Sequence, residues 1–247
     1  MQELRDRTAA EDLAAQGLDR FGTILADPPW QFSNRTGKVA PEHRRLSRYA
    51  TMTHQEILQL PVGQLALPQS HLYLWVPNAL ILEGLEVMKS WGFTYKTNLV
   101  WYKTRKDGGP DGRGVGFYFR NVTELVLFGT RGSLRTLSPG RRQVNILRSQ
   151  KREHSRKPDE LYAVVEQCSP GPYLELFARH RREGWAQWGN EITTPQIAPL
   201  AGQKCAPPAP SGDLDAEAIQ LQLLERRAPY DGTPAHSLQT DQRVGAS

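Results

Sequence analysis

The sequence predicts an α/β sandwich built around a largely parallel sheet. Short apolar runs with strand character alternate with segments of helical periodicity, which is typical of sheets whose strands are joined by helices. No internal repeat is visible in the 247 residues. The expected strands cover 21–26, 73–76, 93–103, 124–128 and 173–177, and the expected helices begin near 53, 78 and 158.

The first strand ends in the tetrapeptide Asp27-Pro28-Pro29-Trp30. Proline cannot donate to a sheet ladder, so the two prolines stop the strand and hold Asp27 at its tip. A carboxylate, two carbonyls and an aromatic ring then lie within four residues. They suit a flat heterocycle with an exocyclic amine, because Asp27 and the Pro28 carbonyl can accept its hydrogens while Trp30 stacks on the ring. The alternative is a polar strand end followed by a rigid turn.

The next helices carry recognisable ends. Thr53 and Glu56 have the spacing of a capping box. Pro77 ends the strand at 73–76, Asn78 is the expected cap of a helix that runs to Ser90, and Gly92 ends that helix.

Two polar connections lie in the second half of the chain. Residues 104–116 are too glycine-rich for the interior of an element, and 129–156 form a long basic connection. Pro158 fits the first position of the following helix, whose apolar face consists of Leu161, Val164, Val165 and Cys168. Pro170-Gly171-Pro172 stops this helix before the strand at 173–177.

Composition divides the chain into three parts. Residues 1–20 predict a helical N-terminal extension, 21–192 predict the main folded domain, to which the resemblance described below gives the catalytic role, and 193–247 predict a linker and tail with a short helix at 214–227. Hydrophobic residues make up 38% of the chain, a low fraction that fits a segment outside the core.

The charge and the cysteines restrict the partners and the compartment. The net charge of +5 favours polyanionic partners. Cys168 and Cys205 are too few for a disulfide framework or a metal cluster. There is no signal-peptide pattern and no apolar run of the roughly 20 residues that span a bilayer. We therefore expect a cytoplasmic protein with no membrane association and no metal.

Eight stretches, in order, resemble the MT-A family of S-adenosylmethionine-dependent adenine-N6 methyltransferases. This family is typified by the catalytic subunit of the eukaryotic messenger-RNA adenosine methyltransferase and also occurs in bacteria and phages; the resemblance here is to the bacterial and phage type. The matching stretches are 26–30, 49–52, 72–76, 99–104, 124–129, 156–160, 174–179 and 188–191.

The resemblance implies a Rossmann-like class I methyltransferase, a three-layer sandwich with S-adenosyl-L-methionine as cofactor. It also implies a permuted, beta-class-like order, with the amine-binding motif before the cofactor strand. No Gly-x-Gly-x-x-Gly loop is needed, since this cofactor has no pyrophosphate. Ligands of such sheets bind beyond the carboxyl ends of the strands, here at Asp27 and Phe177.

The resemblance also implies a set of cofactor residues. Lys157 precedes a helix and suits the methionine carboxylate, although a solvated lysine is the alternative. The alternative to cofactor contact is a paired structural carboxylate for Glu175 and a core position for Phe177. Relatives carry glutamine at the position of Glu191. The expected cofactor residues are Asp27, Lys157, Glu175, Phe177, Arg179, Asn190 and Glu191.

On the substrate side, the resemblance implies that Tyr49 closes the pocket and that Lys103 and Glu124 contact the substrate. A surface lysine and a cross-strand carboxylate are the alternatives for the last two. Trp75 and Trp101 fit the core better than the pocket. The expected catalytic residues are Asp27, Pro28, Pro29 and Trp30.

These expectations converge on methylation of the adenine N6 amine in DNA, with the base flipped out or single-stranded. Arginines and lysines in 131–157 and 179–182 are expected to contact phosphates, although a solvated surface is the alternative. The same chemistry on RNA is the next reading, followed by a catalytically silent nucleic-acid-binding subunit. Methylation of cytosine or of a protein glutamine fits the tetrapeptide but lacks the flanking matches. A homodimer or a heterodimer with a related subunit is open.

Overall fold

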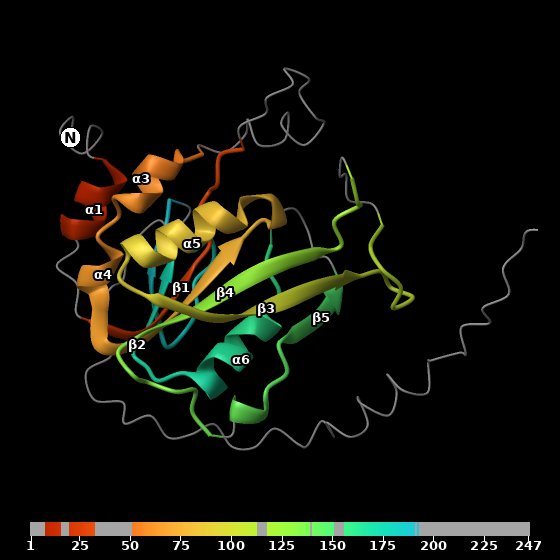
Figure 1. Ribbon diagram of the computed structural model, residues 1–247. Helices are drawn as coiled ribbons and strands as arrows, with labels where there is room; N and C mark the ends of the chain where they lie inside the picture. The colour runs from red at the N-terminus through yellow and green to blue at the C-terminus, as the bar shows by residue number, and fades with distance from the viewer. Residues whose placement is uncertain are drawn as a thin grey trace, which may run out of the picture. The chain divides into compact units, whose positions relative to one another are not determined.

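A seven-stranded sheet forms the centre of the protein (Figure 1), which we describe from a computed structural model. The structure describes residues 8–15, 20–32, 51–112, 118–138, 140–150, 156–190 and 192. The strand order is β5-β3-β4-β2-β1-β6-β7. The strands are β1 (Phe21–Ala26), β2 (Ala66–Val76), β3 (Thr94–Thr104), β4 (Thr123–Arg131), β5 (Ile146–Gln150), β6 (Tyr173–Leu176) and β7 (Trp185–Trp188).

All strands except β4 point in one direction. β1 pairs parallel with β2 and β6, β6 pairs parallel with β7, and β3 pairs parallel with β5. β4 is antiparallel to both β2 and β3, so β3 points the same way as β2. The predicted largely parallel sheet is confirmed. We call the edge at which the six parallel strands end the carboxyl edge, and the opposite edge the amino edge.

Helices cover both faces of the sheet. α5 (Ile81–Ser90) and α6 (Glu160–Cys168) lie on opposite faces (Figure 1), and two hydrophobic clusters separate in the same way. Within β1, Ile24 and Ala26 belong to the α5-face cluster and Leu25 to the α6-face cluster, as the period-2 geometry of a strand requires. This arrangement has three layers, as predicted. The other helical elements are α1 (Ala9–Ala15), α3 (His54–Leu58), α4 (Val62–Leu65), η1 (Asn78–Leu80) and η2 (Gly140–Arg142).

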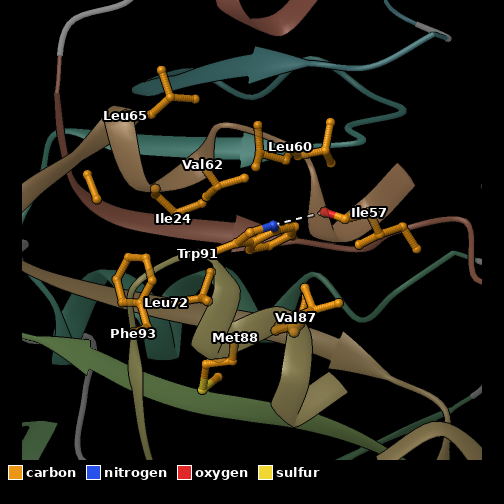
Figure 2. Packing of buried hydrophobic residues seen from close by; sticks show 14 of the residues in the cluster. Ile24, Ile57, Leu60, Val62, Leu65, Leu72, Val87, Met88, Trp91 and Phe93 are labelled. Atoms are coloured by element: carbon orange, nitrogen blue, oxygen red, sulfur yellow. Dashed lines mark hydrogen bonds between the residues drawn. The ribbon is translucent and has the colours of Figure 1, made fainter. Parts of the chain in front are cut away.

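The α5-face core surrounds Trp91, which is 1% exposed. Its ring lies among Val87, Met88 and Leu72, and its indole N–H donates to the Ile57 carbonyl at 3.0 Å (Figure 2). A buried indole needs such an acceptor. The bond fastens α3 to the end of α5.

One predicted helix end is confirmed and another is wrong. Thr53 and Glu56 form the expected capping box before α3. Asn78 does not cap the next helix, because η1 comes first and α5 begins only at Ile81. The Asn78 side chain instead donates to the carbonyl and the hydroxyl of Thr123, at 3.2 and 3.1 Å. This contact ties the end of β2 to the start of β4.

Two strands were not predicted. β5 lies inside the expected basic connection and β7 between Gly184 and Gly189. Both are edge strands of only five and four residues, and such short runs give a weak periodic signal. The Leu13 side chain of α1 is fully buried, and the Asp12 carboxylate accepts from the Trp188 indole at 2.8 Å. The predicted tail at 193–247 lies outside the described residues. In the described part of the chain, no helix is both long and apolar enough to cross a bilayer.

Candidate active site

A row of side chains crosses the α6 face of the sheet near its carboxyl edge. Residues two apart on a strand share a face. Register pairs Trp101 with Glu124 and Trp75 with Val126, and Trp75, Trp101 and Val126 all belong to the α6-face cluster. The same alternation places Asp27, the first residue after β1, and Glu175, the third residue of β6, on this face. In strand order the row, which we call the active-site row, is Lys103, Glu124, Trp75, Asp27 and Glu175.

Three residues of this row and the lysine before α6 form a chain of alternating charges. The Lys157 ammonium lies 3.2 Å from an Asp27 oxygen and 2.9 Å from a Glu124 oxygen. The Lys103 ammonium lies 2.5 Å from the other Glu124 oxygen. The four side chains are between 13% and 27% exposed. The predicted residues Asp27, Lys157, Glu124 and Lys103 therefore meet at one place that solvent reaches.

Burial and neighbouring charges set the protonation states in this chain. Burial raises the pKa of Asp27, although the Lys157 ammonium opposes this effect. Burial works against the charge of Glu124 as well, but Lys157 and Lys103 outweigh it and hold the pKa of Glu124 at about 2. For Lys157, the Asp27 and Glu124 carboxylates outweigh burial and raise its pKa. Glu124 and Lys157 are thus charged at neutral pH, whereas Asp27 is a more basic carboxylate than an exposed aspartate.

Aromatic rings support both ammonium groups. The Lys157 nitrogen lies 4.8 Å from the centre of the Trp75 ring, and the Lys103 nitrogen lies 4.9 Å from the Trp101 ring. The two indoles are buried and meet edge to face at 5.8 Å. Cation–π attraction adds to the ion pairs. The core position expected for Trp75 and Trp101 is confirmed, with this further role.

Trp30 lies elsewhere than its predicted role requires. Its ring is 6% exposed in the α5-face cluster, and its indole N–H donates to the Trp75 carbonyl at 2.9 Å. Its backbone N–H donates to the Pro28 carbonyl at 2.8 Å, and the Pro29 carbonyl accepts from Met52 at 2.9 Å. The ring packs in the core and fixes the turn after Asp27, so this placement does not support stacking on a substrate base. Trp30 is the donor to the Pro28 carbonyl among the described residues, so within them one lone pair of this carbonyl is left for another donor.

The tip of β6 supplies the residues expected at the cofactor. Glu175 accepts from the Tyr162 hydroxyl at 2.7 Å and from the Gln187 amide at 2.8 Å, and burial raises its pKa. Phe177 has a φ of 65° and meets the Trp188 ring at 5.2 Å. A left-handed conformation is costly for a bulky residue and is found where the surrounding structure imposes it. The chain therefore makes a constrained turn directly beside Asp27.

Of the remaining predicted cofactor residues, the structure describes Arg179 and Asn190 but not Glu191. The Arg179 charge opposes the rise that burial causes in the pKa of Asp27. Asn190 is exposed just beyond the end of β7, next to the β6 tip. Tyr49 and Glu191 lie outside the described residues.

Two supporting residues were missed. Tyr162 and Gln187 each occupy one Glu175 oxygen, and Gln187 also accepts from the Arg182 backbone at 2.8 Å. Gln187 stands opposite Glu175 in the β6–β7 register. Recognising β7 would have predicted that pairing.

The chemistry of these groups fits S-adenosyl-L-methionine. Lys157 has three donor hydrogens that can be shared with a further carboxylate, and each Glu175 oxygen keeps a free lone pair for a ribose hydroxyl. Lys157, before α6, is a cation that could hold a carboxylate, and Glu175, near the end of β6, is a carboxylate that could hold a diol, so these two residues suit the polar ends of that cofactor.

The basic residues do not form one surface. Arg131 ends β4, and because β4 is reversed this end lies at the amino edge, where the guanidinium donates to the Gly63 carbonyl. Arg156 pairs with Asp159 at 3.0 Å, and Arg182 pairs with Glu166 at 3.1 Å. Arg131 therefore lies at the edge of the sheet opposite Asp27, and the phosphate contacts expected of the basic residues in 131–157 stay a prediction.

Two surface hollows lie away from the active-site row. One of about 360 Å³ is lined by residues that include Lys96, Thr130 and Leu134. The other, of about 900 Å³, includes Arg20 and Arg131. These residues mark the amino edge, and neither hollow is lined by Asp27 or Lys157.

Comparison with known proteins gives a consistent set of relatives. The family profile described as MT-A70 matches residues 21–191. A Medicago truncatula protein named putative N(6)-adenosine-methyltransferase MT-A70-like is 34% identical over 184 residues, covering 71% of this chain and 27% of that protein. Human N(6)-adenosine-methyltransferase catalytic subunit METTL3 is 29% identical, covering 71% and 29%. Type II methyltransferase M.MunI of Mycoplasma sp is 27% identical, covering 72% and 80%. The chain thus spans about a quarter of the plant and human relatives but most of M.MunI.

Proposed function

The chain belongs to the MT-A70 family of N6-adenosine methyltransferases, and on that premise we propose that it methylates the N6 amine of adenine with S-adenosyl-L-methionine. The observation that carries the proposal is the position of Asp27. This carboxylate ends β1, is partly exposed, pairs with Lys157 and begins an intact Asp-Pro-Pro-Trp tetrapeptide.

The proposed role of Asp27 is to orient a weak nucleophile. The lone pair of an adenine amine is delocalised into the ring. Asp27 accepts one amine hydrogen and the free lone pair of the Pro28 carbonyl accepts the other, which directs the nitrogen lone pair toward the methyl group. Most of the acceleration then comes from positioning and from fixed charges. Because burial raises the pKa of Asp27, its oxygens accept these hydrogens more strongly than those of an exposed aspartate would.

The cofactor, when bound, supplies an electrophilic methyl group on a sulfonium. Lys157 is proposed to bind its carboxylate and Glu175 its ribose. Glu124, held by Lys103, keeps the Lys157 ammonium beside Asp27 and so positions both groups. Phe177, Arg179, Asn190 and Glu191 are proposed to line the rest of the cofactor site.

DNA is the substrate we propose first. The support is M.MunI, a type II methyltransferase that this chain matches over 80% of that protein's length. RNA is the second candidate, because identity is higher to the plant protein, whose name specifies adenosine, a ribonucleoside. In either polymer the base must leave a helix or start single-stranded to reach Asp27. A catalytically silent subunit is disfavoured by the intact tetrapeptide.

The test is incubation of the full chain and cofactor with single-stranded DNA, duplex DNA and RNA of one sequence, followed by mass spectrometry of the nucleosides. We expect N6-methyl-2′-deoxyadenosine. N6-methyladenosine from RNA alone would select the second candidate, and no methylated nucleoside in any arm would overturn the proposal. Analytical ultracentrifugation of the same sample distinguishes a monomer from a homodimer, and added activity from a related chain would reveal a heterodimer.

A further inference from the structure

The loop that joins β3 to β4 presents two consecutive exposed aromatic side chains. Tyr118 is 94% exposed and Phe119 is 85% exposed. In the described residues of this loop, 105–112 and 118–122, no other large hydrophobic side chain is exposed. In the described part of the loop, the exposed apolar surface therefore consists of these two rings.

The loop lies at the carboxyl edge, on the strands that bear Lys103 and Glu124. It leaves the end of β3 and enters the start of β4, and these two antiparallel strands lie side by side (Figure 1). Its base is held by bonds from the Lys103 N–H to the Val122 carbonyl at 2.8 Å and from the Asp111 N–H to the Lys103 carbonyl at 2.9 Å. The Arg120 guanidinium donates to the Gly112 carbonyl at 2.9 Å. Arg120, the residue after Phe119, is therefore bonded to the segment of the loop that follows Lys103.

The exposed charges of this loop and of the neighbouring strand β5 are mainly positive. Lys106 and Arg120 are exposed, while the exposed acid of this region, Asp107, is already paired with Arg105 at 2.9 Å. Arg148 of the neighbouring β5 is exposed as well. Exposed rings among cations are typical of surfaces that bind single-stranded nucleic acid, where bases stack on the rings and cations approach the phosphates.

We infer that Tyr118 and Phe119 form a stacking platform for single-stranded nucleic acid, holding bases some distance along the strand from the target adenine. The inference rests on the proposed function for the identity of the target. It assigns substrate contacts to a loop remote from the reacting atoms.

The sheet register gives the distance from the target to Thr104, where the loop begins. Ala26 is level with Leu74, Leu127 and Asn98 across the sheet, so Asp27 is level with Leu99. Thr104 then lies five residues further along β3, roughly 17 Å at a rise of about 3.3 Å per residue, and about 14 Å sideways over three strand steps. The combined distance to the start of the loop, about 22 Å, corresponds to about six nucleotides at about 3.4 Å per stacked nucleotide.

The experiment measures binding to oligo(dT) and oligo(U), which contain no adenine and therefore report on the platform independently of methyl transfer. We expect the double variant Tyr118→Ala/Phe119→Ala to bind chains of about 12 nucleotides about tenfold more weakly, with an unchanged salt slope because the phosphate contacts remain. Whichever oligomer the wild type binds more tightly identifies the polymer. The pair Tyr118→Phe/Phe119→Tyr, which keeps both rings, should bind normally.

Chain length provides a second readout on adenine-containing substrates. The double alanine variant should raise KM for the long substrate but leave KM for one of about four nucleotides unchanged, because the short chain cannot reach from Asp27 to the loop. Tyr95, an exposed aromatic at the amino end of β3, is the matched control. Tyr95→Ala should bind within about twofold of the wild type, as for most surface substitutions.

Three results would overturn the inference. The first is unchanged binding of both oligomers by the double alanine variant. The second is an equal loss of activity on short and long substrates. The third is conversion of a wild-type dimer to a monomer without loss of oligomer binding, which would show that the rings contact a protein chain. Because oligomer binding needs no methyl transfer, failure of the proposed function would appear separately, as absence of methylated nucleoside from the wild type.

Discussion

Two polar groups lie at opposite ends of α6 on the same face of the sheet, and they differ in charge. Before the helix, Lys157 joins Asp27 and Glu124 in a chain of ions that solvent reaches. After the helix, the Ser169 hydroxyl forms two hydrogen bonds. One joins it to Nδ1 of His71 at 2.7 Å and the other to the Tyr73 hydroxyl at 2.7 Å. That second group is buried, and burial lowers the pKa of His71 and raises that of Tyr73, so it is neutral.

The difference separates a site from a structural network. Buried neutral groups that satisfy each other stabilise and specify a core. Charged groups kept together at a partly exposed strand end carry a desolvation cost that a structural role does not require. The charge chain before α6 is therefore assigned to chemistry and the cluster after α6 to folding.

The largest expected effect is that of Lys157→Met. Removing this ammonium leaves Asp27 and Glu124 without the cation between them, so methyl transfer should fall by about a hundredfold or more. Steady-state kinetics measures it, with Lys89→Met, an exposed lysine in the last turn of α5, as the control. Equal activity of both variants would show that the ion chain has no catalytic role.

Ser169→Ala tests the other end of the helix. It leaves the buried His71 nitrogen and Tyr73 hydroxyl without their shared partner, which should lower the free energy of unfolding by about 2 kcal/mol. Chemical denaturation measures the loss. Methyl transfer well below the melting temperature should be unchanged, and a specific loss of turnover would contradict the separation of the two groups.

Glu124→Gln is expected to reduce turnover by about tenfold, because the ammonium of Lys157 loses its fixed partner. It also changes acid stability. The pKa of Glu124 is about 2 in the folded chain and 4.5 ordinarily, so the wild type has this stabilisation above pH 4.5 and loses it as the pH falls toward 2. Denaturation at several pH values should show a shallower decline in the variant. Parallel curves would rule out the ion pairs as the cause.

The smallest effect is expected for Trp30→Phe. The variant keeps an aromatic ring but removes the bond to the Trp75 carbonyl, and should lose about 1 kcal/mol of unfolding free energy with KM for nucleic acid unchanged. A raised KM at unchanged stability would restore the predicted stacking role.

Local patterns in the sequence predicted much of this architecture. The proline pair fixed the end of β1, and the spacing of Thr53 and Glu56 fixed the start of α3, because each depends on neighbouring residues alone. β5 and β7 were missed because their burial depends on which strand lies beside them. The hydrogen-bond partners of Trp30 and Asn78 were not predictable either. These partners, Trp75 and Thr123, lie on or next to other strands, so they depend on the sheet order rather than on neighbouring residues.

The candidate site follows the same rule. The strand ends that carry Asp27 and Glu175 were predictable from local sequence. The convergence of Lys103, Glu124 and Lys157 on Asp27 required the sheet order, which places β4 between β2 and β3.

The most direct test of the role of Asp27 is Asp27→Asn, with methyl transfer and cofactor binding measured on the same preparation. The amide keeps the shape of the carboxylate but not its charge, so at saturating cofactor we predict a fall in turnover of at least about a hundredfold. Asp107→Asn, in an exposed ion pair, should behave as the wild type. Wild-type turnover in Asp27→Asn with cofactor bound would contradict the assignment of this carboxylate to the reaction.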